Sequence, residues 1–187
     1  GEERLFQLLD ILKKGDYDFT GMNGILWRDK ETLKINKIKN IGWYGAKKHH
    51  ATLDDIYPPD FSIYEDPKKF FSNKVISAGG MSSRRSPVGS MLTSRGCPYK
   101  CSFCASPVTT GQKMRFRSPE NVIREVDVLV NTYGVKEIIF QDDEMYAHRQ
   151  RAVEIVKLLK ERNYDLVWKN LNIASWRLDF ELLKLMK

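Results

Sequence analysis

The three cysteines of this chain, Cys97, Cys101 and Cys104, lie in one eight-residue stretch and are the only cysteines among its 187 residues. Three thiols at this spacing favour a metal site. A structural zinc ion takes four nitrogen or sulfur ligands, usually as two separated pairs. Here no fourth Cys is present, and the histidines lie more than forty residues from this stretch. A [4Fe-4S] cluster is normally held by one cysteine thiolate per iron, so three cysteines would leave one iron open to a further ligand.

The residues around the cysteines favour a loop over a helix. The three positions are spaced i, i+4 and i+7, so a helix would place them in one stripe. Gly96 and Pro98 flank the first cysteine, however, and the residue before a proline is disfavoured in the α region. Pro107 closes the stretch, and residues 90–94 are expected to form a strand that leads into it. Buried structural thiols and a zinc site remain the alternatives to an iron–sulfur cluster.

The positive charge of the chain is concentrated around the cysteines. The net charge is +7, and residues 67–119 contain no Asp or Glu. The Lys and Arg residues of this window are Lys68, Lys69, Lys74, Arg84, Arg85, Arg95, Lys100, Lys113, Arg115 and Arg117. Because a cluster with three thiolates is anionic, the absence of carboxylates favours its reduction. A nucleic-acid patch and a solvated basic face are the alternatives. A solvated face suits Lys68 and Lys69. For the four basic residues nearest the cysteines, an electrostatic role toward the cluster and a solvated face both remain open; they are Arg95, Lys113, Arg115 and Arg117.

The segment T-S-R-G-C-P-Y-K-C-S-F-C-A-S, with Phe103 directly before the last cysteine, resembles the signature of the radical S-adenosylmethionine (SAM) enzymes. This resemblance implies that Cys97, Cys101 and Cys104 each bind one iron, and that the amino and carboxylate groups of SAM chelate the fourth. One electron, from a donor such as flavodoxin or ferredoxin, would then cleave SAM to methionine and a 5′-deoxyadenosyl radical. Phe103 would lie against the adenine end of SAM, mainly through its backbone.

The first half of the chain predicts little regular structure. Residues 2–14 have the leucine spacing of an amphipathic helix that ends at Gly15, and residues 24–28 and 32–36 predict a β-hairpin. Residues 41–89 lack periodicity, which is typical of a connector laid over a domain surface. Within them, residues 52–60 resemble the L-D-x-x-P-x-P segment of cobalamin-binding radical SAM proteins. We therefore expect residues 1–89 to be the end of an upstream cobalamin-type domain plus a linker. No D-x-H-x-x-G motif occurs, so cobalamin is expected only in a part of the protein that precedes this chain.

Residues 90–187 predict alternating strands and helices. Strands are expected at 137–141 and 166–174, and helices at 119–134, 147–162 and 180–187, with Ser118 as the cap of the first helix. Repetition at this pitch implies parallel strands joined by right-handed crossovers. The predicted fold class is therefore α/β: the first three β/α units of a radical SAM (β/α)6 TIM-like barrel, preceded by a mostly irregular linker with a helix and a hairpin. Residues 90–187 would be the N-terminal half of that core domain.

Polar residues follow two of the predicted strands, where barrel enzymes place their chemistry. In radical SAM enzymes the end of the second strand holds the SAM amino group, and the F-x-D-D segment at 140–143 resembles the variant of cobalamin-binding members. The resemblance implies that Asp142 and Asp143, and less directly Glu144, bind the SAM ammonium. Capping of the next helix is the alternative for one of these acids. Arg177, in an S-x-R-x-D pattern, would pair with the SAM carboxylate or form an ordinary salt bridge at the barrel rim.

The sequence thus predicts a radical SAM enzyme, a cobalamin-dependent type of methyltransferase or a cyclase acting on an unknown substrate. A tRNA methylthiotransferase is an alternative, since residues 111–117 resemble the basic loop of those enzymes, although their three further cysteines are missing from residues 1–89. A non-catalytic zinc or nucleic-acid-binding module is the alternative from another class. No stretch approaches 18 apolar residues, so no membrane span is expected. Reduced cysteines predict a cytoplasmic setting.

Overall fold

The computed structural model describes residues 2–22, 24–36, 53–55, 58–71 and 82–187. The chain divides into two compact units, residues 1–49 and 50–187. None of the described helices is long and apolar enough to cross a membrane.

The first unit contains the predicted helix and hairpin. Helix α1 spans Glu2–Lys13, and strands β1 (Leu26–Asp29) and β2 (Thr32–Ile35) pair in antiparallel fashion. The side-chain amide of Asn36 donates hydrogen bonds to the carbonyl groups of residues 19, 20 and 22, which fixes the loop between helix and hairpin. Both elements are confirmed, with β1 beginning two residues later than predicted.

The described part of the linker belongs to the second unit and packs through aromatic rings against the end of helix α3 (Pro119–Asn131). Three 3-10 turns lie in it, at Leu53–Asp55, Phe61–Ile63 and Pro67–Phe71. The rings of Phe61 and Phe71 lie 5.7 and 5.1 Å from the ring of Tyr133, which follows helix α3. The rest of the predicted connector, residues 41–52, 56–57 and 72–81, lies outside the described residues.

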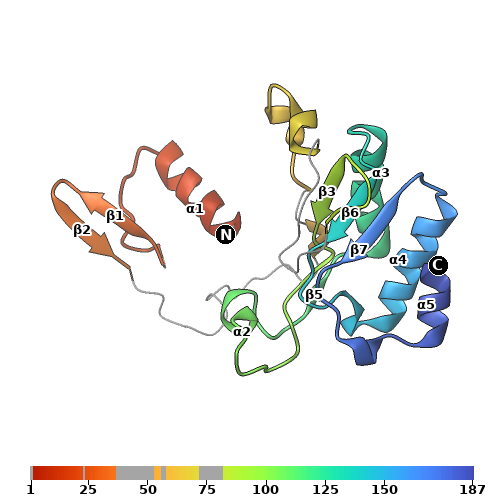
Figure 1. The fold of residues 1–187 in the computed structure, drawn as a ribbon. Helices are drawn as coiled ribbons and strands as arrows, with labels where there is room; N and C mark the ends of the chain where they lie inside the picture. The colour runs from red at the N-terminus through yellow and green to blue at the C-terminus, as the bar shows by residue number, and fades with distance from the viewer. Residues whose placement is uncertain (1, 23, 37–52, 56–57, 72–81) are drawn as a thin grey trace. The chain divides into compact units, whose positions relative to one another are not determined.

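The second unit is built on a parallel sheet of three strands in the order β3-β6-β7 (Figure 1). They span Val88–Met91, Glu137–Phe140 and Val167–Asn170, and their register aligns Met91, Phe140 and Asn170. Each strand is followed by a helix: α3, α4 (Arg149–Glu161) and α5 (Phe180–Met186). The prediction of three successive parallel β/α units is confirmed. Strand β3 begins two residues earlier, and β7 ends four residues earlier, than the sequence suggested.

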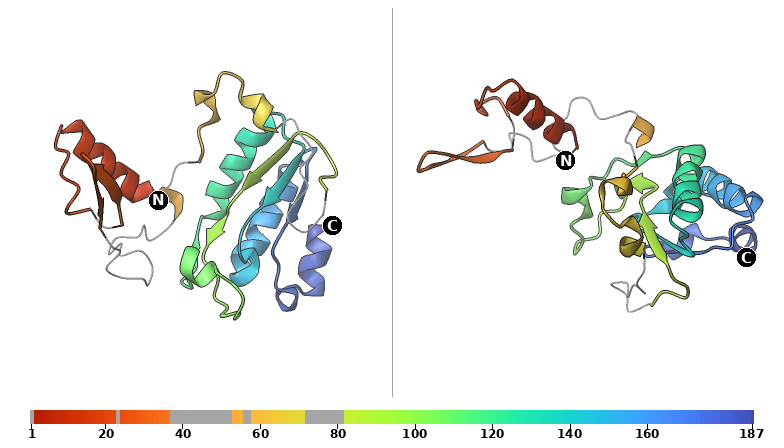
Figure 2. Two further views of the ribbon diagram at one scale, coloured as in Figure 1. Left: turned by 60° about the vertical axis from the view of Figure 1, so that its left-hand side comes forward. Right: turned by 90° about the horizontal axis from the view of Figure 1, so that it is seen from above.

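All three helices cover one face of the sheet (Figure 2). Their apolar side chains, among them Val122, Val126 and Ile155, form one buried core with Ile138 and Phe140 of β6. Ser118 caps α3 by accepting a hydrogen bond from the Asn121 N–H at 3.2 Å, as its position before Pro119 predicts. Because the three strands are parallel, their carboxyl ends lie at one edge of the sheet.

Two short strands and a short helix around the cysteines were not predicted. Strand β4 (Ser94–Arg95) pairs antiparallel with β5 (Arg115–Phe116), and helix α2 spans Ser106–Thr109. These elements are too short for a hydrophobic period to reveal them. We call residues 96–105, between β4 and α2, the cysteine loop.

Candidate functional site

The cysteine loop begins at a glycine that the backbone requires. Gly96 has φ +99°, and a Cβ atom there would lie 2.6 Å from the carbonyl oxygen of Lys113 and 3.1 Å from that of Gly111. The next residue, Cys97, donates its N–H to the Gly111 carbonyl at 3.0 Å. Only glycine combines this conformation with such a close approach. The first cysteine is thereby fixed against the segment that leads into β5.

All three cysteines are free thiols, with Cys101 and Cys104 exposed and Cys97 half-buried. Partial burial, together with the nearby Asp143 and the other two cysteines, raises the pKa of Cys97. Hydrogen bonds with Ser106 lower the pKa of Cys104, whose sulfur lies 3.3 Å from the Ser106 Oγ and 3.4 Å from the Ser106 nitrogen. The three sulfurs share one loop, but among the described residues they do not meet in the geometry of a bound metal ion. Three unpaired thiols on one accessible loop form a donor set that suits an iron–sulfur cluster.

Asp142 is completely buried and bonded to the segment before the cysteine loop. Its carboxylate accepts hydrogen bonds from the Thr93 N–H at 3.0 and 3.1 Å and from the Thr93 hydroxyl at 2.7 Å. The Ser94 hydroxyl donates to the same carboxylate. This acid therefore connects the end of β6 to β4.

Asp143 points to the other end of the cysteine loop. It is half-buried, and its two carboxylate oxygens accept hydrogen bonds from the hydroxyls of Ser106 at 3.3 Å and Thr110 at 2.6 Å. Ser106 in turn contacts the sulfur of Cys104. Of the three consecutive acids, Asp143 is the one that lies beside the cysteines.

Glu144 is buried and connects the ends of the second and third strands. Its carboxylate accepts hydrogen bonds from the N–H groups of Tyr146 and Ala174, both at 3.0 Å. The side chain of Asn172 donates to the carbonyl oxygen of Asp142 at 3.1 Å. The expected helix-capping role thus falls to Glu144, at the 3-10 turn Met145–Ala147, while His148 caps α4.

Arg177 reaches the cysteine loop from the third strand end. It lies in the 3-10 turn Ser175–Arg177 and donates from Nε to the Tyr99 hydroxyl at 2.7 Å. The ring of Tyr99 also packs edge-on against Trp176, with 5.4 Å between ring centroids. Phe103, on the same loop, is 91% exposed, so its ring makes little contact with the rest of the chain. The ends of all three strands therefore contact the cysteine loop or the residues beside it.

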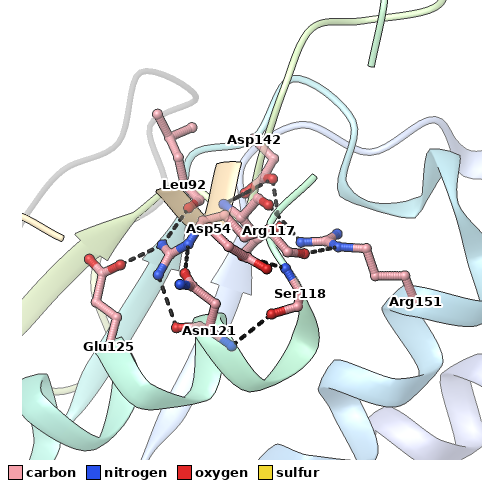
Figure 3. Close-up of polar contacts among 9 residues, drawn as sticks. Asp54, Leu92, Arg117, Ser118, Asn121, Glu125, Asp142 and Arg151 are labelled. Carbon is pink, nitrogen blue, oxygen red and sulfur yellow. Dashed lines mark hydrogen bonds and ion pairs between the residues drawn. The ribbon is translucent and has the colours of Figure 1, made fainter. Parts of the chain in front are cut away.

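Two buried arginines, Arg117 and Arg151, bond to backbone carbonyls of the segments around strands β4 and β5 (Figure 3). Arg117 pairs with buried Glu125 and also donates to the Leu92 carbonyl and to Asn121. Arg151 donates to the backbone carbonyls of Arg117 at 2.7 Å and Thr93 at 2.6 Å, and burial lowers its pKa to about 10. Of the four basic residues whose role was left open, Arg117 is thus an internal structural residue, whereas Lys113 is exposed.

The linker is hydrogen-bonded to the start of helix α3. Asp54 accepts a hydrogen bond from the Ser118 N–H at 2.8 Å (Figure 3), while Leu53 beside it is buried. A cavity of about 300 Å³ lies between linker residues and the ends of β3 and β6, and its lining includes Pro58, Arg95 and Gln141. The described linker therefore forms one wall at the end of the sheet that carries the cysteine loop.

Several residues of this site were missed at the level of sequence. Tyr99, Ser106 and Thr110 contact the predicted residues Arg177 and Asp143, and Thr93 holds Asp142. Ser106 and Tyr99 lie within two residues of a cysteine, which is a usable signal. Thr93 and Thr110 carried no such signal, because their partners are distant in sequence.

Residues 91–187 match the family model of the radical SAM superfamily. The chain belongs to the radical SAM superfamily. The resemblance of its cysteine motif to that family is thereby confirmed.

Two curated methyltransferases match nearly the whole chain. The uncharacterized methyltransferase PH0819 of Pyrococcus horikoshii is 30% identical over 168 residues, covering 90% of this chain and 32% of that protein. The cytidylyl-2-hydroxyethylphosphonate methyltransferase of Streptomyces wedmorensis is 34% identical over 179 residues, covering 88% of this chain and 33% of that protein. The chain thus spans about a third of the length of these relatives.

Solved radical SAM structures share the fold. The cobalamin-dependent enzyme OxsB superposes with a TM-score of 0.59 and 22% identity, over 90% of this chain and 21% of that chain. The methyltransferase TsrM from Kitasatospora setae superposes with a TM-score of 0.58 and 18% identity, over 87% of this chain and 28% of that chain. These similarities confirm the predicted partial radical SAM fold.

Proposed function

We propose that this chain carries the cluster-binding half of a radical SAM enzyme, a methyltransferase or cyclase of the cobalamin-dependent type. The observation that carries the proposal is the exposed loop with three free thiols at the carboxyl edge of a parallel sheet, contacted from all three strand ends. Cys97, Cys101 and Cys104 would each hold one iron of a [4Fe-4S] cluster. When bound, that cluster would supply the electron for reductive cleavage of SAM. The cluster would receive this electron from an external donor.

The residues around the loop have distinct tasks in this proposal. Asp143, half-buried beside Cys104, accepts the SAM ammonium, while Asp142 and Glu144 hold the strand ends through their buried hydrogen bonds. Arg177 is anchored through Nε to Tyr99, which leaves its terminal nitrogens for the SAM carboxylate. Phe103 offers its backbone and exposed ring to the adenine.

The kind of reaction is suggested by the relatives. Those matched include methyltransferases and the anaerobic magnesium-protoporphyrin IX monomethyl ester cyclase of Rubrivivax gelatinosus, 34% identical over half of this chain. Two of the similar solved structures, one of TsrM and one of OxsB, have cobalamin bound, and we place cobalamin in a domain upstream of this chain. The tRNA methylthiotransferase alternative rested on the basic loop at residues 111–117. The ion pair of Arg117 with Glu125 weakens this alternative, because it leaves Arg117 buried and not available to bind RNA.

Anaerobic reconstitution of the full-length protein tests the cluster. We expect about four irons and four sulfides per chain, with one iron lacking a cysteine ligand. Metal analysis and sulfide determination measure the iron and sulfide content per chain directly. A colourless protein with one zinc per chain would instead support the zinc module.

Replacing Asp143 tests the SAM site. A hydrogen bond to a charged group contributes about 1.5–3 kcal/mol, so Asp143→Asn should weaken SAM binding roughly tenfold or more. Its iron content should stay at the parent level, because Asp143 is not an iron ligand in this proposal. Calorimetric titration of the reconstituted protein with SAM measures the affinity.

Asp142→Asn is the matched control for this measurement. Asp142 accepts hydrogen bonds from Thr93 and Ser94 inside the fold, so its replacement should lower the unfolding temperature rather than the SAM affinity of the folded protein. Parent-like SAM affinity in Asp143→Asn, or a specific loss in Asp142→Asn, would refute the assignment.

A further inference from the structure

Ser106 makes two contacts with the sulfur of the third cysteine. Its backbone N–H donates to the Cys104 sulfur at 3.4 Å, and its hydroxyl oxygen lies 3.3 Å from the same atom. In the free thiol, the Cys104 S–H is the donor to that hydroxyl. A thiolate bound to iron has no proton, so the hydroxyl would then become the donor.

The Ser106 hydroxyl has a second acceptor within reach. Asp143 Oδ1 lies 3.3 Å from it, and the other carboxylate oxygen is held by the Thr110 hydroxyl at 2.6 Å. A hydroxyl carries a single proton, so it can donate fully either to the thiolate or to the carboxylate. Loss of the charge on Asp143 would favour the bond to sulfur.

The backbone holds Ser106 in this position. Its carbonyl accepts hydrogen bonds from the N–H groups of Thr110 and Gly111, both at 2.9 Å, and the Gly111 carbonyl accepts the Cys97 N–H. The same short segment, residues 106–111, therefore contains both the carbonyl that binds the Cys97 N–H and the N–H that donates to the Cys104 sulfur. The backbone of Ser106, including the N–H that donates to the Cys104 sulfur, is therefore held in place.

We propose that Ser106 is a positioning residue that sets the hydrogen bonding of the Cys104 sulfur, and that Asp143 competes with this sulfur for its hydroxyl proton. The inference rests on the proposed function, since it concerns the cluster that Cys104 would bind. Hydrogen bonds to ligand sulfurs stabilise the more negative, reduced cluster and raise its reduction potential, whereas a nearby carboxylate lowers it. Ser106 and Asp143 therefore act on the potential with opposite signs.

Redox titration of the reconstituted full-length protein, followed by electron paramagnetic resonance, tests this. Ser106→Ala should lower the ratio of reduced to oxidised cluster roughly tenfold at fixed solution potential, equivalent to a shift of about 59 mV for a one-electron couple. Ser106→Thr should keep the parent potential because it keeps the hydroxyl. Ser102→Ala is the matched control, since Ser102 is exposed on the same loop and its replacement should leave the reduction potential at the parent value.

Asp143→Asn should shift the potential upward, and this shift should be smaller in a Ser106→Ala background, because part of it passes through the Ser106 hydroxyl. An unchanged potential in Ser106→Ala with full iron content would overturn the proposal. So would an Asp143→Asn shift that is downward or independent of Ser106. If Ser106→Ala binds too little iron to titrate, the sign of the Asp143→Asn shift and the Ser106→Thr value decide. Absence of a cluster in the parent itself would count against the proposed function, so the two failures are distinguishable.

Discussion

Cys97→Ala, Cys101→Ala and Cys104→Ala are each expected to abolish assembly of the cluster. Each cysteine is assigned its own iron, and the chain contains no fourth cysteine that could substitute. Iron and sulfide analysis of anaerobically reconstituted full-length variants, together with loss of the cluster's visible absorption, measures the effect. The expected result is near-complete loss in all three.

The fold should survive two of these replacements. Cys101 and Cys104 are exposed and belong to no buried core, so their alanine variants should keep the parent circular dichroism and unfolding temperature. Ser102→Ala serves as the control, because it alters the same loop without removing a sulfur. A variant of any one cysteine that retains four irons would show that this cysteine is not an iron ligand.

Gly96→Ala is expected to remove most of the cluster without touching a cysteine. The added Cβ would lie 2.6 Å from the Lys113 carbonyl oxygen, a distance that real Cβ atoms essentially never show. The neighbouring atoms are backbone, so they can move only by breaking the Cys97–Gly111 hydrogen bond or the pairing of β4 with β5. Misplacing Cys97 in this way should prevent the three thiols from closing on one cluster. Iron content per chain is again the measurement.

Gly134→Ala is the matched control for Gly96→Ala. Gly134 also has a positive φ, +71°, but a Cβ there would meet nothing within 4 Å. This variant has only the cost of a left-handed conformation, about 1–2 kcal/mol, and should keep its iron. Equal iron content in the two variants would mean that the contact of Gly96 with the 111–113 segment is unimportant for the cluster.

The acidic run at 142–144 illustrates how one sequence pattern divides into separate tasks. Asp142 and Glu144 are buried, and their carboxylates accept hydrogen bonds from neighbouring segments of the fold, at Thr93 and at Ala174. Asp143 is half-buried, and its carboxylate meets the hydroxyls of Ser106 and Thr110. In our proposal Asp143 is therefore the acid that faces SAM, whereas the sequence pattern also suggested Asp142 and, less directly, Glu144.

The sequence by itself determined the family, the fold class and the identity of the cysteine loop. Local signals were sufficient for these: the spacing of three cysteines, the glycine and prolines that exclude a helix, and the period of apolar residues in α3 and α4. Caps such as Ser118 before Pro119 located a helix start to the residue. The short strands β4 and β5 were not predicted, because a strand of two residues is too short to show a hydrophobic period.

Only the tertiary structure decided which side chains meet. The partners of Asp143 lie 33 and 37 residues away, and Arg177 meets Tyr99 across 78 residues. Such pairings depend on the register of β6 against β3 and on the path of the loop between β4 and β5, which no local pattern encodes. The same holds for Arg117. The sequence left open whether its charge acts on the cluster or lies on a solvated face, and the ion pair with buried Glu125 places it inside the fold. Burial and pairing are properties of the packed chain, because they depend on distances between segments that are remote in sequence.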